Sequence, residues 1–232
     1  MALTNNFCDF TVKIYYLCQQ IINETIYYYM IKNIILDYGG VVVNVYNEMI
    51  KQAFRDLHVP IWKQLWYHRR IKRLMDEYIN GIRPTDEVMQ EMLALCGKQV
   101  SMAQLQGVVN MLAGELPKER LLKIRKLRKK YKVFVLSNIN ETLWRTSVRQ
   151  IEELGMHVED CFDDVFLSYA MHVAKPDADI YRQMILSTGI QPEETLYLDD
   201  RVENVEAGRK MGLIAELVVS NQLEQNKAWK QL

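Results

Sequence analysis

The 232-residue sequence lacks several features that would define a class of protein. It has no apolar run of the ~18 residues that a membrane-spanning helix needs, so we expect no membrane partner. Its four cysteines are scattered and form no CxxC pair. They indicate neither a zinc site nor a disulfide framework, and they favour a reducing cytoplasm. Lys plus Arg and Asp plus Glu are equal at 29 each, so no overall charge attracts the chain to nucleic acid.

The chain also contains no internal repeat and no low-complexity tract. Its composition, 49% hydrophobic and 25% charged, is typical of a soluble globular protein, and its length fits one domain with or without an insertion. Residues 1–29 precede the first convincing strand. Polar residues interrupt their apolar ones, and no secretory cleavage pattern follows. Two interpretations stay open: a loosely attached extension outside the working protein, or a packed helix.

Strand and helix patterns alternate over most of the chain. Short apolar runs end near residues 37, 137, 168, 200 and 219, and amphipathic helical patterns occupy 117–131, 141–156, 177–189 and 202–212. This order predicts an α/β fold with a doubly wound parallel sheet. From 46 to 116 the pattern is helical, with helices expected within 48–59, 62–81 and 85–97. We therefore predict an extension of 1–29, an α/β core of 30–45 and 117–232, and a small all-helical insertion of 46–116.

Polar side chains follow three of the predicted strands at the point where each strand ends. Asp37 ends the first strand, Ser137 another, and Asp199 with Asp200 a third. Ligands of such sheets bind beyond the carboxyl ends of the strands, so these residues are expected to converge. An ionised carboxylate after a buried strand is costly unless something binds it, and adjacent carboxylates repel each other. The pattern favours a site for a metal and an anion.

Four short motifs complete this pattern in a fixed order: ILDYGGVV, VLSN, AKPDADIY and LYLDDRVENVEAG. Together they resemble the four motifs of the haloacid dehalogenase (HAD) superfamily of phosphatases and related enzymes, over roughly residues 30–220. The resemblance implies a Rossmann-like HAD core, and it places the predicted helical insertion where that family carries its small helical cap.

The resemblance also implies a role for each motif residue. The expected enzyme is a Mg²⁺-dependent phosphatase that hydrolyses a small phosphorylated metabolite, such as a sugar phosphate, through an aspartyl-phosphate intermediate. Asp37 would be the nucleophile, and Lys175 would steady both nucleophile and phosphate. The remaining roles are phosphate binding by Ser137 and Asn138, metal binding by Asp37, Asp200 and the Gly39 carbonyl, and support by Asp199 and Asn204. A carboxylate nucleophile, a hard cation and a fixed ammonium are what phosphoryl transfer requires.

The first motif departs from the usual pattern at Gly39. Most phosphatases of the family carry there an aspartate that protonates the leaving group, a contribution of about 10²–10⁴-fold. Relatives with D-x-G-G or D-x-G-N are grouped with sugar-phosphate phosphatases, which favours an enzyme. A catalytically weakened or inactive phosphate- or partner-binding protein is the alternative. A dehalogenase is a third, with less support because it would not need both Asp199 and Asp200.

Other candidate residues favour ordinary structural roles. The stretch WYHRRIKR, residues 66–73, mixes aromatic and basic residues. We interpret it as a helix with one solvated face; nucleic-acid binding and recognition of a leaving group by Trp66, Tyr67 and Arg70 are the alternatives. The basic run KIRKLRKK reads as a solvated helix face. The four histidines share no ligand spacing; they are His58, His68, His157 and His172. The sequence does not determine an oligomeric state.

Overall fold

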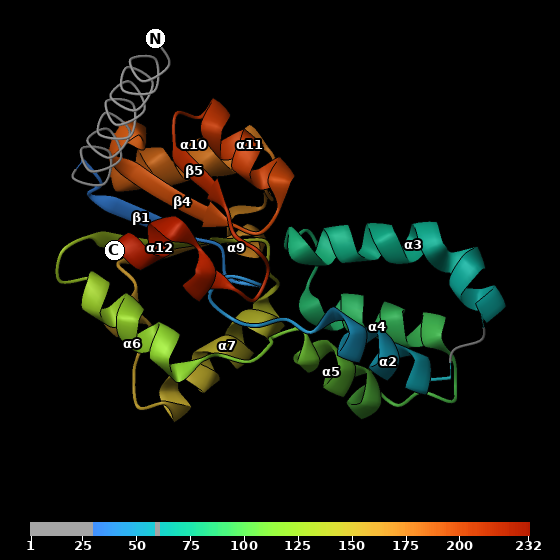
Figure 1. The fold of residues 1–232 in the computed structure, drawn as a ribbon. Coiled ribbons are helices and arrows are strands. Elements are labelled where there is room, and N and C mark those ends of the chain that lie inside the picture. Colours follow the sequence, from blue (N-terminus) through green and yellow to red (C-terminus); the bar gives the residue numbers. More distant parts are fainter. Residues whose placement is uncertain (1–29, 59–60) are drawn as a thin grey trace, which may run out of the picture.

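The computed structural model describes residues 30–58 and 61–232 and contains a five-stranded parallel sheet. The strands lie in the order β3-β2-β1-β4-β5 (Figure 1). Their bounds are β1 Asn33–Leu36, β2 Lys132–Ser137, β3 Asp164–Leu167, β4 Thr195–Asp199 and β5 Ile214–Leu217. Each predicted strand is thus present, and the predicted doubly wound parallel sheet is confirmed. The order of the sheet changes direction at β1, which places β2 on one side of it and β4 on the other.

Both faces of the sheet are covered because alternate side chains of the buried strands point to opposite sides. Ile34 and Leu36 pack into one hydrophobic core, while Ile35 packs into the other. Helices α6 (Lys118–Leu127) and α7 (Glu141–Glu153) cover the first face, and α10 (Ala178–Thr188) and α11 (Val202–Lys210) cover the second (Figure 1). The shorter elements are α8 Val158–Cys161, α9 Ser168–Met171, η1 Pro192–Glu194, η2 Leu223–Gln225 and α12 Lys227–Gln231.

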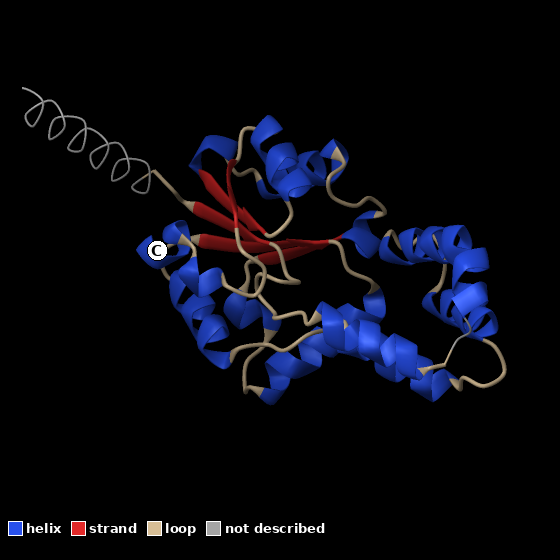
Figure 2. Cartoon of the chain, turned by 45° about the vertical axis from the view of Figure 1, so that its right-hand side comes forward, coloured by secondary structure: helices blue, strands red, loops and turns tan. Residues whose placement is uncertain are grey.

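A segment with four helices, residues 46–116, follows β1 and is called the helical segment below. It contains α2 Asn47–Asp56, α3 Ile61–Ile79, α4 Thr85–Cys96 and α5 Met102–Met111. Helix α4 begins at the predicted Thr85 and ends before Gly97. Helix α5 lies within the predicted helical insertion, although no bounds were predicted for it; it begins with a capping box between Ser101 and Gln104. The strands point toward the side of the molecule on which these helices lie (Figure 2).

The two chain segments that connect the helical segment to the sheet pair with each other. Asn44 and Glu115 form an isolated antiparallel bridge, with both backbone hydrogen bonds present at 2.8 and 2.9 Å. Gly114 makes this close approach possible, because a Cβ at this position would lie 2.4 Å from the Asn44 carbonyl oxygen. The helical segment therefore leaves and re-enters the sheet at one point near the end of β1.

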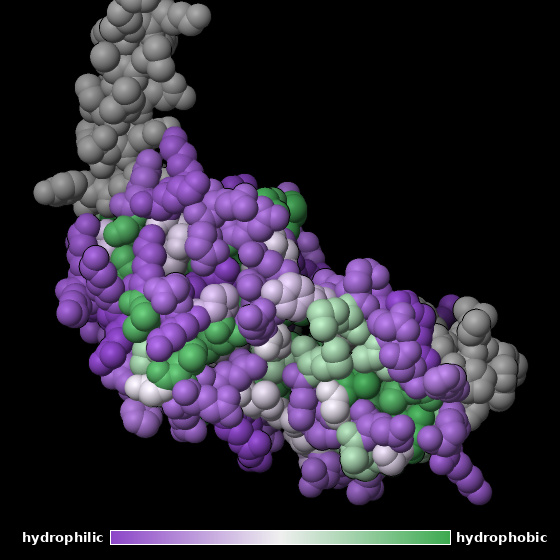
Figure 3. Space-filling view, turned by 60° about the horizontal axis from the view of Figure 1, so that its bottom comes forward, coloured by the Kyte–Doolittle hydropathy of each residue, from purple (hydrophilic) through white to green (hydrophobic). Residues whose placement is uncertain are grey.

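The surface is mostly hydrophilic on the face that carries α6 and α7, with smaller hydrophobic patches (Figure 3). Helix α6 explains part of this, because Leu121, Ile124 and Leu127 are buried while most of its basic residues are not. Arg120 is the exception, since it is buried under the loop that follows β1. Among residues 30–58 and 61–232, no helix is long and apolar enough to cross a membrane.

Candidate active site

Asp37 lies at the carboxyl end of β1, directly after the fully buried residues Ile34–Leu36. Asp37 itself is 7% exposed. Its Oδ1 accepts a hydrogen bond from the backbone N–H of Tyr38 at 2.7 Å and lies 2.9 Å from Nζ of Lys175. The backbone N–H of Asp37 donates to the Leu198 carbonyl in β4. The sheet therefore fixes the position of this carboxylate at its edge.

Lys175 comes from the loop between α9 and α10, and it is 4% exposed. Besides Asp37, its Nζ contacts Oδ2 of Asp199 at 2.6 Å and the carbonyl of Leu136 at 2.7 Å. These three partners match the three protons of an ammonium group. Burial alone lowers the pKa of Lys175, but the carboxylates of Asp37 and Asp199 outweigh burial and raise it. Lys175 is a fixed positive charge between two carboxylates.

Asn138 holds this lysine from the loop after β2. Its Nδ2 donates to the Lys175 carbonyl at 2.7 Å, and its Oδ1 accepts from the Lys175 N–H at 2.8 Å. The side chain of Asn138 is therefore occupied by the backbone of Lys175. Ser137 is buried at the end of β2, the strand next to β1. The structure thus brings Ser137, Asn138, Lys175 and Asp37 to the same edge of the sheet.

The neighbouring residues Asp199 and Asp200 have different surroundings. Asp199 is fully buried, and donors surround it: Nζ of Lys175, the hydroxyl of Tyr197, the backbone N–H of Arg201 and Nδ2 of Asn204. Burial by itself raises the pKa of Asp199, but Lys175 and these hydrogen bonds outweigh it and lower the pKa. Asp199 is committed to internal contacts, and its main effect is to hold Lys175.

Asp200 is only partly buried, and its carboxylate hydrogen-bonds the exposed Ser220. Burial raises its pKa despite that bond, and the charge of Asp199 raises it further. Burial likewise raises the pKa of Asp37 to about 6, although Lys175 lowers it. Both carboxylates are therefore less stabilised as anions than Asp199 is.

One oxygen from each of Asp37, Asp199 and Asp200 lies within 4.8 Å of the others, a group compact enough to share one divalent cation. Carboxylate oxygens are the ligands that Mg²⁺ prefers. Burial raises the pKa of Asp37 and of Asp200, and a bound cation would stabilise both carboxylates as anions. The residues present fit a hard cation bound by Asp37 and Asp200, with Asp199 oriented toward Lys175.

The two glycines after Asp37 have different requirements. Gly40 has a φ of +78°, and a Cβ there would lie 2.2 Å from Oδ2 of Asp200. Glycine is needed at this position, because any side chain would displace the candidate metal ligand. Gly39 does not have a positive φ, and its nearest neighbour for a Cβ is Cγ2 of Val45 at 3.7 Å. An aspartate at position 39 would therefore meet neither backbone strain nor a clash at its Cβ.

Two residues of this site carry buried polar groups with distinct roles. Asn204, from α11, donates Nδ2 to both carboxylate oxygens of Asp199, at 3.0 and 3.1 Å. Its Oδ1 is buried and has no hydrogen-bond partner among the described residues. Sequence reasoning missed Tyr197, whose hydroxyl donates to Asp199. A signal was available, because residues 197 and 199 share one side of β4.

The other candidates lie away from this cluster or outside the described residues. The ring of His58 contacts the Asp56 carbonyl, His157 lies at the N-cap of α8, and the ring of His172 contacts the Asn80 carbonyl. Arg70 pairs with Glu91 inside the helical segment at 2.8 Å. The predictions made for the side chains of Trp66, Tyr67 and His68 fall outside what the structure describes.

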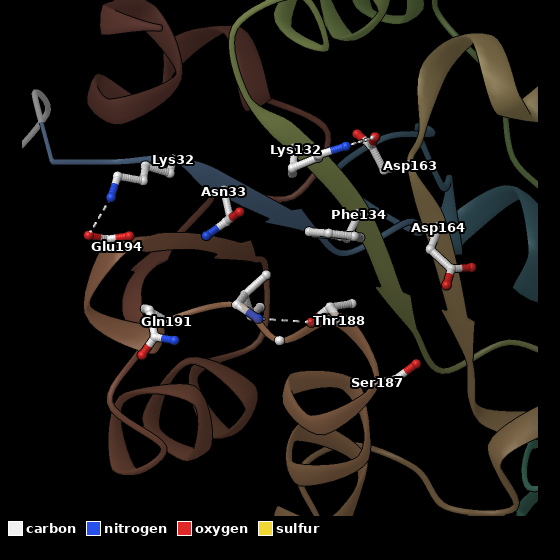
Figure 4. Close-up of a pocket in the computed structure, with 12 residues that line it drawn as sticks. Lys32, Asn33, Lys132, Phe134, Asp163, Asp164, Ser187, Thr188, Gln191 and Glu194 are labelled. Carbon is white, nitrogen blue, oxygen red and sulfur yellow. Dashed lines mark hydrogen bonds and ion pairs between the residues drawn. The ribbon is translucent and has the colours of Figure 1, made fainter.

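A hollow of about 450 Å³ lies at the opposite end of the strands (Figure 4). Lys32 and Lys132 line it at the amino ends of β1 and β2. Both are ion-paired, Lys32 with Glu194 at 2.7 Å and Lys132 with Asp163 at 3.1 Å. The acidic partners neutralise these lysines, so the hollow does not compete with the carboxyl edge as a phosphate site.

A doubly wound parallel sheet with an acidic cluster and a buried lysine at its carboxyl edge is the architecture of the haloacid dehalogenase-like hydrolases. The model of that family matches residues 31–212, and the chain therefore belongs to it. The resemblance drawn from the four motifs is confirmed.

Individual relatives agree with this assignment. The D-ribitol-5-phosphate phosphatase of Bacteroides thetaiotaomicron is 32% identical over 190 residues, which cover 79% of this chain and 89% of the relative. The crystal structure of a HAD family enzyme of the same bacterium has a TM-score of 0.78 at 27% identity, covering 83% of this chain and 95% of the other. A predicted HAD-like hydrolase of Porphyromonas gingivalis has a TM-score of 0.75 at 26% identity, covering 87% and 97%. The Bacteroides HAD enzyme has also been solved with magnesium and inorganic phosphate.

Proposed function

We propose that this chain is a Mg²⁺-dependent phosphatase that hydrolyses a small phosphorylated metabolite through an aspartyl-phosphate on Asp37. The observation that carries the proposal is the buried contact of 2.9 Å between Asp37 and Lys175 beside the acidic cluster. A carboxylate held next to a fixed ammonium and a candidate cation site can attack an anionic phosphate, because both positive charges reduce repulsion. The Bacteroides HAD family enzyme solved with magnesium and inorganic phosphate supports this proposal.

The chemistry divides into two displacements. In the first, an oxygen of Asp37 forms a bond to phosphorus while the bond from phosphorus to the leaving oxygen breaks, and the departing oxygen takes a proton from water to give the alcohol. In the second, water attacks the phosphorus of the acyl phosphate, releasing inorganic phosphate and restoring the carboxylate. Lys175 holds Asp37 and balances the phosphoryl charge, and Ser137 with backbone N–H groups near it binds phosphoryl oxygens. Mg²⁺ held by Asp37, Asp200 and the Gly39 carbonyl would neutralise phosphate charge.

Asn138, Asp199 and Asn204 act through Lys175 in this proposal. Asn138 fixes the backbone of the lysine, and Asn204 and Tyr197 fix the carboxylate that contacts its ammonium. Because the side chain of Asn138 is occupied by Lys175, its backbone N–H would be the group that binds phosphate. The helical segment would serve as the cap over this site, with residues 30–45 and 117–232 as the core.

The substrate class follows from similarity. The relative that covers most of the chain acts on D-ribitol 5-phosphate, so an open-chain or cyclic sugar phosphate is the proposed substrate. We infer no nucleic-acid or membrane partner, and the scattered cysteines favour a cytoplasmic location.

The test is release of inorganic phosphate from a panel of phosphorylated metabolites that includes D-ribitol 5-phosphate, with Mg²⁺ and with a chelator. We expect turnover of at least one sugar phosphate, lost with the chelator and recovered on adding Mg²⁺. Absence of turnover on the whole panel and on aryl phosphates would favour the non-catalytic alternative that Gly39 raises. Activity that persists in the chelator would contradict the metal site.

A further inference from the structure

The loop after β1, residues 38–45, is hydrogen-bonded to the chain segment that follows β5. We call residues 218–224 the strap. Its first residue, Val218, donates its N–H to the carbonyl of Asp199 at 2.9 Å. Ser220 contacts the carboxylate of Asp200. The strap therefore contacts the backbone of Asp199 and the carboxylate of Asp200 before it reaches the loop that follows Asp37.

Asn221 is the residue of the strap that contacts this loop at two places. Its backbone N–H donates to the carbonyl of Gly40 at 2.7 Å. Its side chain pairs with the backbone of Val45, accepting from the N–H at 2.8 Å and donating to the carbonyl at 3.0 Å. One residue thus joins the glycine turn beside the acidic cluster to the residue at which the chain enters the helical segment.

The conformation of Asn221 shows that this arrangement is specific. Its φ is +64°, in the left-handed region that side chains other than Asn and Asp rarely adopt. In this conformation the N–H and the side-chain amide of Asn221 reach two peptide groups five residues apart, Gly40 and Val45. The side-chain amide of Asn221 thus pairs with both the N–H and the carbonyl of Val45, as the backbone of a neighbouring strand would.

The middle of the same loop has a second anchor. Arg120 donates to the carbonyls of Val41 and Val42 at 2.8 and 3.2 Å and to Oδ1 of Asn44 at 3.1 Å. Glu224, the last residue of the strap, binds the guanidinium of Arg120 at 2.6 and 2.8 Å. Arg120 and the strap therefore hold the loop at several points between Gly40 and Val45, so a movement of Val45 is expected to be transmitted to Gly40.

Within the turn, the N–H of Gly40 donates to the carbonyl of Val43 at 2.8 Å. The peptide that joins Gly39 to Gly40 is trans and planar, so the Gly39 carbonyl points away from Val43. The orientation of this carbonyl, the proposed metal ligand, depends on the same short turn that Asn221 holds at Gly40.

We propose that Asn221 is a positioning residue that couples the orientation of the helical segment to the peptide groups of Gly39 and Gly40; this rests on the phosphatase function proposed above. A displacement of Val45, as the helical segment changes its angle to the sheet, is transmitted through the amide of Asn221 to the Gly40 carbonyl. Substrate that contacts the helical segment and Mg²⁺ at the sheet edge then favour the same arrangement of the loop.

The test uses Asn221→Gly in the full chain. Glycine accepts the left-handed backbone without strain, so the substitution removes the two side-chain hydrogen bonds and leaves the N–H to Gly40. The matched control is His58→Gly, which also replaces a left-handed residue (φ +51°) but lies between α2 and α3, where its ring contacts the Asp56 carbonyl and its backbone N–H donates to the Arg55 carbonyl. Both variants gain the same backbone freedom in the unfolded chain.

The first measurement is amide hydrogen exchange of residues 37–46 with and without Mg²⁺ alone. We expect Mg²⁺ to slow exchange in the wild type and in His58→Gly. In Asn221→Gly, exchange should accelerate about tenfold at Val45, and the protection by Mg²⁺ at Gly40 should diminish. Exchange like that of the wild type, with and without Mg²⁺, would overturn the proposal.

The second measurement compares two substrates. For D-ribitol 5-phosphate, Asn221→Gly should raise KM about five- to tenfold with a smaller change in kcat, because two hydrogen bonds that favour the bound arrangement are lost. For p-nitrophenyl phosphate, which has no polyol to contact the helical segment, KM should change less than about twofold. An equal loss with both substrates would show that Asn221 only supports the fold. If the wild type hydrolyses neither substrate, the comparison uses the sugar phosphate that the panel identifies; if the whole panel fails, the proposed function fails, while the exchange experiment still decides the role of Asn221.

Discussion

The two sides of the candidate active site are built in opposite ways. On the side of β4, ionised groups are buried and bound: Lys175 contacts two carboxylates and a carbonyl, and Asp199 receives several donors. On the side of Gly39, the loop offers backbone only, and space for a side chain is left open next to Val45. The first side can neutralise a phosphate, whereas the second provides no proton for a leaving group. The comparison indicates an enzyme that depends strongly on charge and on its substrate's leaving group.

On the charged side, the largest loss of activity is expected from a substitution of Asp37. Asp37→Asn keeps the shape of the side chain and removes the charge of the proposed nucleophile, so we expect kcat to fall by about 10⁴-fold or more. Steady-state phosphate release measures it, with circular dichroism to show an intact fold. Wild-type activity in this variant would refute the assignment of Asp37.

On the glycine side, the role of the missing acid can be tested by placing an aspartate at position 39. Without an aspartate at position 39, the wild type should hydrolyse aryl and anomeric phosphates faster than primary alkyl phosphates, because their oxygens leave without a proton more easily. Gly39→Asp should narrow this gap by up to about 10²-fold, within the range of general acid catalysis. The measurement is kcat/KM against leaving-group pKa.

The neighbouring glycine gives a matched control for that experiment. Gly40→Asp places a Cβ 2.2 Å from Oδ2 of Asp200 at a positive φ, and it should lose activity with every substrate. A flat dependence on leaving-group pKa in the wild type would show that another group supplies the proton.

A substitution of Asp200 can distinguish the contribution of the metal from that of Lys175. Asp200→Ala removes one carboxylate from the acidic cluster, so the Mg²⁺ concentration for half-maximal activity should rise about 10- to 100-fold. Asp164→Ala, at the amino end of β3, removes an exposed carboxylate elsewhere and should leave it unchanged. Equal metal requirements in both variants would place the cation elsewhere.

The charge of the acidic cluster should also be visible in the pH dependence of stability. The pKa of Asp37 is raised to about 6 in the folded protein, from an ordinary value of 3.8. Between these two values the folded state binds more protons than the unfolded state, so this group's contribution to stability falls as pH rises. Without Mg²⁺, the wild type should therefore lose a few degrees of Tm relative to Asp37→Asn between pH 4 and pH 7. Parallel curves would contradict the raised pKa.

The smallest effect is expected outside the site. A chain that begins at Met30 contains all four motifs and every described strand, so it should retain activity and a Tm within about 2 °C of the full chain. A larger loss of Tm on thermal unfolding would show that residues 1–29 pack on the core. Their predicted nature lies outside the described residues.

The sequence by itself determined the α/β core and the chemical types at its edge. Each of the five strands ends close to its predicted position, because a buried parallel strand needs a continuous apolar run that few other segments provide. Asp37, Ser137, Asp199 and Asp200 could be placed together because the carboxyl ends of parallel strands share one edge. Helix α5 lies in the predicted helical insertion but was given no bounds, and α12 was not anticipated, since short helices of mixed polarity have weak periodicity.

Only the tertiary structure decided how these groups divide their roles. The adjacency of Asp199 and Asp200 in the sequence does not show that Asp199 is fully buried against Lys175 while Asp200 is partly exposed, because burial depends on which side chains pack against each residue in the fold. The sequence also left open which glycine requires a left-handed backbone; the structure assigns it to Gly40 and leaves room at Gly39. Asn221 had no local signal, because its partners Gly40 and Val45 lie more than 170 residues earlier in the chain and only folding brings them together.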